Sequence, residues 1–234
     1  MYLYGIIKTI TTMGHIELFE KERALGYNCF VDTWIPNYYF FLEKLPQLLQ
    51  NKVSNKHLLA VGCGTGNEID QFCNDQSWHV TGIDPSPEMI QQAIERFGKR
   101  PNVHLIHGAI EHFEPLSPFG AATLLLVLHF MKDDGSKLQL LSAISKKLEL
   151  NAPLILLDIT GKDESFKDNL NLLSLLLPES LPEAEVAQRL QRIERALYPV
   201  SEERLVQLLH EAGFGQPCRF FQTTIYMGWI AYRR

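Results

Sequence analysis

The sequence predicts an α/β fold: a doubly wound, Rossmann-like sheet of seven strands, mostly parallel with one antiparallel strand, plus a helical lid insertion. Three observations predict it. Short apolar runs alternate with amphipathic helical patterns. A glycine-rich turn follows the first apolar run, at 57–62. The run at 121–130 is apolar throughout, as expected for a central parallel strand that is buried on both faces.

The glycine turn is the most informative stretch of the chain. Gly62, Gly64 and Gly66 alternate directly after the apolar run 58–61, and a helical pattern begins at 67–73. Glycines allow positive φ and let a ligand approach the backbone. A helix that starts there adds free N–H groups and a partial positive charge, which suit an anion. A strand, this turn and a helix together predict a nucleotide site.

An acidic residue follows at a matching distance. Residues 78–84 are expected to form the next strand, which ends in Asp84, 18 residues after Gly66. A carboxylate at that place can accept hydrogen bonds from both hydroxyls of a ribose. The run D-P-S-P-E-M-I then continues from Asp84 to residue 90.

These motifs together resemble those of class I S-adenosylmethionine (AdoMet) methyltransferases, which carry (D/E)-x-G-x-G-x-G and D-x-S-x-x-M-(I/L). The resemblance covers most of residues 55–234 and implies AdoMet as cofactor and methyl transfer, and the acidic charge balance with the apolar insert at 161–200 favours a small-molecule acceptor. It implies an N-terminal cap at 1–54 and a catalytic domain at 55–234, with the lid at about 161–200. The cofactor-binding residues that it implies are Gly62, Cys63, Gly64, Gly66, Asp84, Pro85, Met89, Ala109, Ile110 and Leu128.

The N-terminal cap is rich in aromatic residues. Residues 1–16 are expected to be a short strand, an arm or a poorly ordered end, and 17–26 to be helical. A helix should begin near Pro36 and bury Phe40 and Phe41. Because the cap of related enzymes often closes the pocket, the substrate-pocket candidates here are Tyr27, Trp34 and Tyr38.

The remaining elements follow in order. Strands are expected at 57–62, 78–84, 103–108, 121–130, 153–160, 217–222 and 224–233, and helices should alternate with the first five. Later helices are expected at 86–97, 134–150 and 201–212, with two more inside 161–200. The segment 170–177 is so apolar that it should pack on the domain or on a partner.

Three arginines of the insert, Arg189, Arg192 and Arg195, recur at helical spacing. They form either a solvated face paired with glutamates, which is the favoured interpretation, or a clamp for an acidic substrate. Arg189 and Arg192 are therefore also substrate-pocket candidates.

His129 is the candidate general base, because it lies at the end of the fourth strand, where open α/β sheets bind ligands. The alternative is a histidine that is hydrogen-bonded at the sheet edge. The histidines are scattered without metal-ligand spacing, so no metal is expected.

The sequence departs from the family pattern at three acidic positions. Ala60, Ala109 and Gly120 stand where relatives commonly carry an acid. Two further hypotheses therefore accompany the small-molecule methyltransferase. One is a relative of the carboxy-AdoMet synthase of tRNA modification, to which the region around the fourth strand is similar. The other is an AdoMet-fold binding protein without catalysis.

Composition limits the partners. A net charge of −5 over 234 residues argues against a broad nucleic-acid surface, and no apolar run reaches membrane-spanning length. Four cysteines without a C-x-x-C pair favour reduced thiols and a cytoplasmic location. A monomer or a homodimer is expected.

Overall fold

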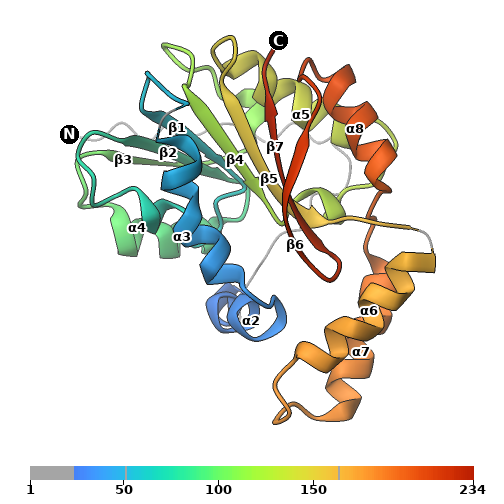
Figure 1. Cartoon of the computed structure of the whole chain (residues 1–234). Coiled ribbons are helices and arrows are strands. Elements are labelled where there is room, and N and C mark those ends of the chain that lie inside the picture. Colours follow the sequence, from blue (N-terminus) through green and yellow to red (C-terminus); the bar gives the residue numbers. More distant parts are fainter. Residues whose placement is uncertain (1–23, 51, 163) are drawn as a thin grey trace.

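The computed structural model describes residues 24–50, 52–162 and 164–234, which form a seven-stranded sheet in the order β3-β2-β1-β4-β5-β7-β6 (Figure 1). Strand β7 runs antiparallel to both of its neighbours, and the pairs among β1 to β5 are parallel. The predicted doubly wound sheet with one antiparallel strand is thus confirmed. The strands are β1 His57–Val61, β2 His79–Asp84, β3 Val103–His107, β4 Ala121–Leu125, β5 Pro153–Ile159, β6 Cys218–Thr223 and β7 Tyr226–Tyr232.

Helices cover both faces of this sheet. The α-helices are α2 Tyr27–Trp34, α3 Tyr38–Leu49, α4 Pro87–Phe97, α5 Ser136–Lys147, α6 Glu164–Leu176, α7 Glu183–Ala196 and α8 Glu202–Glu211. The two helices expected inside 161–200 are present as α6 and α7, which extend away from the sheet in Figure 1.

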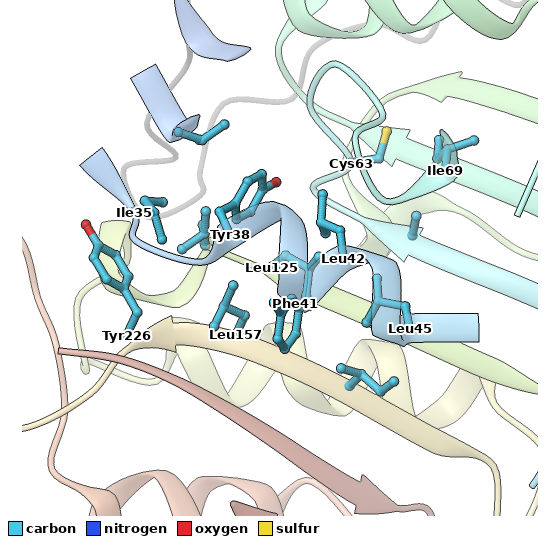
Figure 2. Close-up of a cluster of buried hydrophobic side chains, with 14 of the residues drawn as sticks. Ile35, Tyr38, Phe41, Leu42, Leu45, Cys63, Ile69, Leu125, Leu157 and Tyr226 are labelled. Atoms are coloured by element: carbon cyan, nitrogen blue, oxygen red, sulfur yellow. The ribbon is translucent and has the colours of Figure 1, made fainter. Parts of the chain in front are cut away.

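Alternating side chains of the strands divide the core into two layers. Ile155 and Leu157 of β5 face a cluster built with α2, α3, α4, α6 and α7, whereas Leu154 and Leu156 face a cluster built with α5 and α8. Figure 2 shows the first layer, where Phe41 of α3 lies over the sheet near Leu157. Helix α3 therefore fixes the N-terminal segment above the carboxyl ends of the central strands.

Two predicted elements are wrong in length. The helix expected after the glycine turn is one 3-10 turn, η1 Ile69–Gln71, because the turn-forming run N-D-Q-S at 74–77 leaves only seven residues for it. The strand expected at 121–130 ends at Leu125, where Leu126 adopts φ +60° and the chain enters a second 3-10 turn, η3 Leu128–Phe130.

Two other expectations need correction. The helix expected between β3 and β4 is the single 3-10 turn η2 Ile110–His112, so full α-helices follow only β2 and β4 among the first four strands. Phe41 is buried as predicted, but Phe40 is 54% exposed because it lies on the outer face of α3. The expectations for residues 1–16 and for most of 17–26 fall outside the described residues.

Candidate active site

A cavity of about 430 Å³ lies at the carboxyl ends of the parallel strands. Its walls come from the turns after β1, β2, β3 and β4, from α2 and α7, and from the first residue of β7. The lining is mostly apolar with a few polar groups at separate places, which is typical of a small-molecule site.

The glycine turn and Asp84 form one end of the cavity. Gly62 and Gly64, with φ of +64° and +53°, line it, and a Cβ on Gly62 would stand 2.6 Å from Val127 Cγ2. The carboxylate of Asp84 accepts hydrogen bonds from the backbone N–H groups of Gly64 and Ser86, both at 2.8 Å. Burial raises the pKa of Asp84 against the lowering effect of these bonds. Asp84 thus holds the glycine turn in place while it faces the cavity.

A polar cluster, in which Thr65, Asn67 and Glu68 are buried, lies behind the glycine turn. Arg96 of α4 donates to Thr65 O at 2.7 Å and to Asn67 Oδ1 at 2.9 Å, and the Thr65 hydroxyl donates to Asn28 Oδ1 at 2.6 Å. Burial raises the pKa of Glu68 to about 8. Within the part of the chain that the structure describes, Asn67 Nδ2 and Glu68 Oε1 have no hydrogen-bond partner.

His129 and Asp158 form a buried pair at the carboxyl ends of β4 and β5. His129 Nδ1 lies 2.8 Å from Asp158 Oδ1, and both side chains are at most 4% exposed. The contact occupies Nδ1, so Nε2 is the ring nitrogen that stays available to another group. His129 is also one of the residues that line the cavity.

Asp158 also shapes the turn that carries His129. Its carboxylate accepts from the backbone N–H groups of Val127 at 3.1 Å, Leu128 at 2.8 Å, His129 at 3.1 Å and Ile159 at 2.9 Å. These bonds draw residues 127–129 out of the sheet and into η3. They are the physical reason why β4 ends earlier than its apolar sequence predicts.

The insert supplies the other end of the cavity. Arg189 and Arg192 of α7 line it together with Tyr226. The Arg189 guanidinium lies 4.5 Å from the ring centroid of Phe30 in α2, which also lines the cavity. Burial raises the pKa of Tyr226, and the nearby charge of Arg189 opposes that rise. Two arginines and Asp84 thus line the same cavity.

The structure brings most of the predicted residues to this cavity. The ones that line it are Gly62, Gly64, Asp84, Pro85, Met89, Ala109, Ile110, His129, Tyr27, Arg189 and Arg192. Arg195 is exposed, and it does not line the cavity.

Five predicted residues lie elsewhere. Cys63 and Leu128 are buried in the two core layers, and Gly66 packs on Phe97, whose ring would stand 2.7 Å from a Cβ there. Trp34 at the end of α2 and Tyr38 at the start of α3 are buried in the first core layer, and neither lines the cavity.

The missing acids have different structural settings. Only glycine fits at position 120, because a Cβ there would lie 1.8 Å from the backbone carbonyl oxygen of Asn55. Ala60 is fully buried in β1, within the first core layer. Ala109 lines the cavity, so only this departure leaves an alanine methyl group where an acid would meet a ligand.

Sequence reasoning missed Asp158 and Tyr226. Asp158 ends a buried parallel strand, as Asp84 does, and this position was the one available signal for it. No local pattern identifies Tyr226, because the antiparallel pairing of β5 with β7 brings it to the site from the far end of the chain.

Two kinds of feature are absent from the described ranges 24–50, 52–162 and 164–234. No group of His, Cys, Asp and Glu side chains in them could hold a metal ion. None of their helices is long and apolar enough to cross a membrane.

Comparison with known proteins gives the family of the domain. Residues 58–151 match a family model described as a methyltransferase domain. Curated relatives include the tRNA U34 carboxymethyltransferase of Shewanella piezotolerans, 35% identical over 80 residues, which are 33% of this chain and 24% of that protein. The enzyme of the same name from Shewanella denitrificans is 32% identical over 107 residues, covering 44% of this chain and 32% of that protein. The chain thus spans about a quarter to a third of the length of these relatives.

Solved structures share the architecture over most of the chain. The plantazolicin methyltransferase BpumL, solved with a triazolic desmethylPZN analogue and SAH, has a TM-score of 0.68 at 13% identity, and the match covers 91% of each chain. Human N-acetylserotonin methyltransferase has a TM-score of 0.55 at 16% identity, covering 89% of this chain and 59% of that one. The resemblance is thus confirmed at this level: residues 58–151 match a methyltransferase domain, and the chain shares the fold of solved methyltransferases.

Proposed function

We propose that this protein is an AdoMet-dependent methyltransferase that transfers a methyl group to a small, largely apolar acceptor bearing an anionic group. The observation that carries the proposal is the single cavity shared by Asp84 with its glycine turn, the His129–Asp158 pair and two arginines of the insert. The acceptor's charge is inferred from Arg189 and Arg192, and its apolar body from the rest of the lining.

The residues present fit the cofactor. Gly62 and Gly64 leave the cavity wall without side chains where a Cβ would approach Val127 and Met89. Asp84 offers a carboxylate to ribose hydroxyls, and Ile110 offers an apolar surface to adenine. Glu68 Oε1, buried without a partner in the described chain, lies behind the glycine turn, outside the cavity lining. AdoMet supplies an electrophilic methyl group on a sulfonium.

The chain's own residues would activate the acceptor. Asp158 holds the His129 imidazole through Nδ1, which leaves the lone pair on Nε2 for the proton of the acceptor. The imidazolium that results is stabilised by the carboxylate of Asp158. The arginines orient the anionic end of the acceptor, and the mostly apolar walls exclude water.

The cap and the insert would close the site. Tyr27, Phe30, Val31 and Ile35 of the N-terminal segment line the cavity from one side, and α7 lines it from another. This supports a division into an N-terminal cap, residues 1–54, and a catalytic domain, residues 55–234, whose insert at about 161–200 covers the acceptor.

Calorimetric titration with S-adenosylhomocysteine tests the cofactor site. The wild type should bind in the micromolar range, and D84A should weaken binding by more than tenfold, which is about 1.4 kcal/mol. D70N is the matched control, because Asp70 is an exposed acid close to the same turn and does not line the cavity. Equal affinities of wild type and D84A would contradict the proposal, as would the absence of binding by ligand-free wild type.

A second candidate function is a carboxy-AdoMet reaction in tRNA modification. It is supported by the match to enzymes named tRNA U34 carboxymethyltransferase and by the two arginines, which could bind a carboxylate on the cofactor. Mass spectrometry of ligand released from the purified protein separates the two functions. A carboxylated S-adenosyl compound that is lost in R189M or R192M would support the second, whereas AdoMet or SAH alone would support the first.

A further inference from the structure

We propose that Lys137 is a positioning residue that fixes the base of the helical insert to the turn carrying His129, so that one buried cation sets both halves of the acceptor site. The inference concerns the site described above and extends the proposed function to a residue outside the cavity lining. It stands on hydrogen bonds and burial within the folded chain.

Lys137 is a fully buried cation at the start of α5, with a relative exposure of 0%. Its ammonium group donates to the carbonyl oxygen of Leu128 and, at 2.9 Å, to that of Tyr198. Leu128 begins η3, the turn that carries His129, and Tyr198 follows α7, the helix that carries Arg189 and Arg192. A single side chain therefore joins the two segments.

A backbone hydrogen bond connects the same two segments, and here residue 198 is the donor. The backbone N–H of Tyr198 donates to the carbonyl oxygen of His129 at 2.7 Å. Residues 198 and 128–129 are thus joined by two independent contacts, one through the backbone and one through Lys137.

Both ends of the insert meet at this place. The N–H of Gly161 donates to the carbonyl oxygen of Val200 at 2.8 Å, and Thr160 and Val200 form a parallel bridge. The insert therefore begins and ends beside β5, next to Asp158. Fixing residue 198 fixes the base from which α6 and α7 extend.

Burial of this cation is costly unless it is well paired. Desolvation lowers the pKa of Lys137, and the nearby carboxylates of Asp158 and Asp133 oppose that effect. A methionine or leucine would fill the same space without this cost. The hydrogen bonds of the ammonium group to the carbonyl oxygens of Leu128 and Tyr198 give a physical reason for a lysine at this buried position.

Hydrogen exchange of the full chain tests the role without any ligand or acceptor. In K137M, the Tyr198 amide should exchange at least tenfold faster than in the wild type, and peptides from α6 and α7 should also exchange faster. Helix α8 and strands β1 to β5 should be unchanged. K147M is the matched control, because Lys147 lies on the same helix, is 7% exposed and contacts only the exposed Glu114 at 3.6 Å among the described ion pairs.

A spectroscopic measurement separates positioning from general stability. The ring resonances of His129, assigned with H129Q, should shift or broaden in K137M and stay unchanged in K147M. If K137M does not fold, K137Q is measured instead, since it keeps a donor for one of the two carbonyl groups. Exchange at residue 198 within twofold of K147M, a uniform rise across the whole sheet, or unchanged His129 resonances would overturn the proposal. Because the measurement needs no cofactor, its failure is distinguishable from failure of the proposed function.

Discussion

Asp84 and Asp158 occupy equivalent places in the fold and are used in different ways. Each is a buried carboxylate near the end of a parallel strand, and each accepts hydrogen bonds from the backbone of a neighbouring turn. Asp84 accepts two such bonds and one from the Ser86 side chain, and it lines the cavity, whereas Asp158 accepts four backbone bonds and a contact with His129 Nδ1. The Asp84 carboxylate can therefore still accept hydrogen bonds from a ligand, whereas the hydrogen bonds of the Asp158 carboxylate are all made within the protein.

The largest effect is expected at Asp158. D158A would leave up to four backbone N–H groups without an acceptor, each worth about 1–3 kcal/mol where it is buried. We expect a loss of at least about 3 kcal/mol in the free energy of unfolding, measured by urea denaturation. A loss below about 1 kcal/mol would show that the turn does not depend on this carboxylate.

The matching change at Asp84 should act on binding more than on folding. D84N keeps one acceptor oxygen for Gly64 or Ser86, so the stability loss should stay near 1 kcal/mol. Affinity for S-adenosylhomocysteine should fall by more than tenfold, because the amide cannot replace the charged acceptor. The comparison fails if D84N unfolds as readily as D158A and binds as tightly as the wild type.

Glu68 is a third buried acid, to be compared with Asp84 and Asp158. One of its carboxylate oxygens, Oε1, has no hydrogen-bond partner in the described chain. Its pKa rises from 4.5 to about 8 on folding because burial disfavours its charge. Between these values the folded protein holds a proton that the unfolded chain has released, so stability should fall as pH rises through this range. E68Q should lose this slope.

The measurement is urea unfolding of wild type and E68Q at pH 5.5 and pH 8. Between these two pH values the free energy of unfolding should fall further in the wild type than in E68Q, by more than roughly 1 kcal/mol. Asp84, whose pKa is also raised by burial, contributes in the same direction in both proteins. Parallel pH profiles would mean that Glu68 is ionised in the folded state.

The sequence predicted the sheet and the cofactor end of the cavity, because both depend on local patterns. The glycine turn, Asp84 and Ile110 sit in short motifs whose spacing determines their position. Asp158, Tyr226 and Lys137 could not be found this way, since their roles arise from pairing between segments distant in the chain. The early end of β4 has the same origin, because a carboxylate on β5 redirects its backbone.

The tight contact at Gly120 limits how this protein could be redesigned. An engineer who restored the acid common in the family at this position would drive a side chain into the backbone at Asn55 and disturb its bonds to Pro118 and Glu149. Ala109 offers the practical alternative, since its side chain already borders open space. Of the three acids that the chain lacks, the one at 109 can be reintroduced by a single substitution, and the one at 120 requires a rebuilt loop.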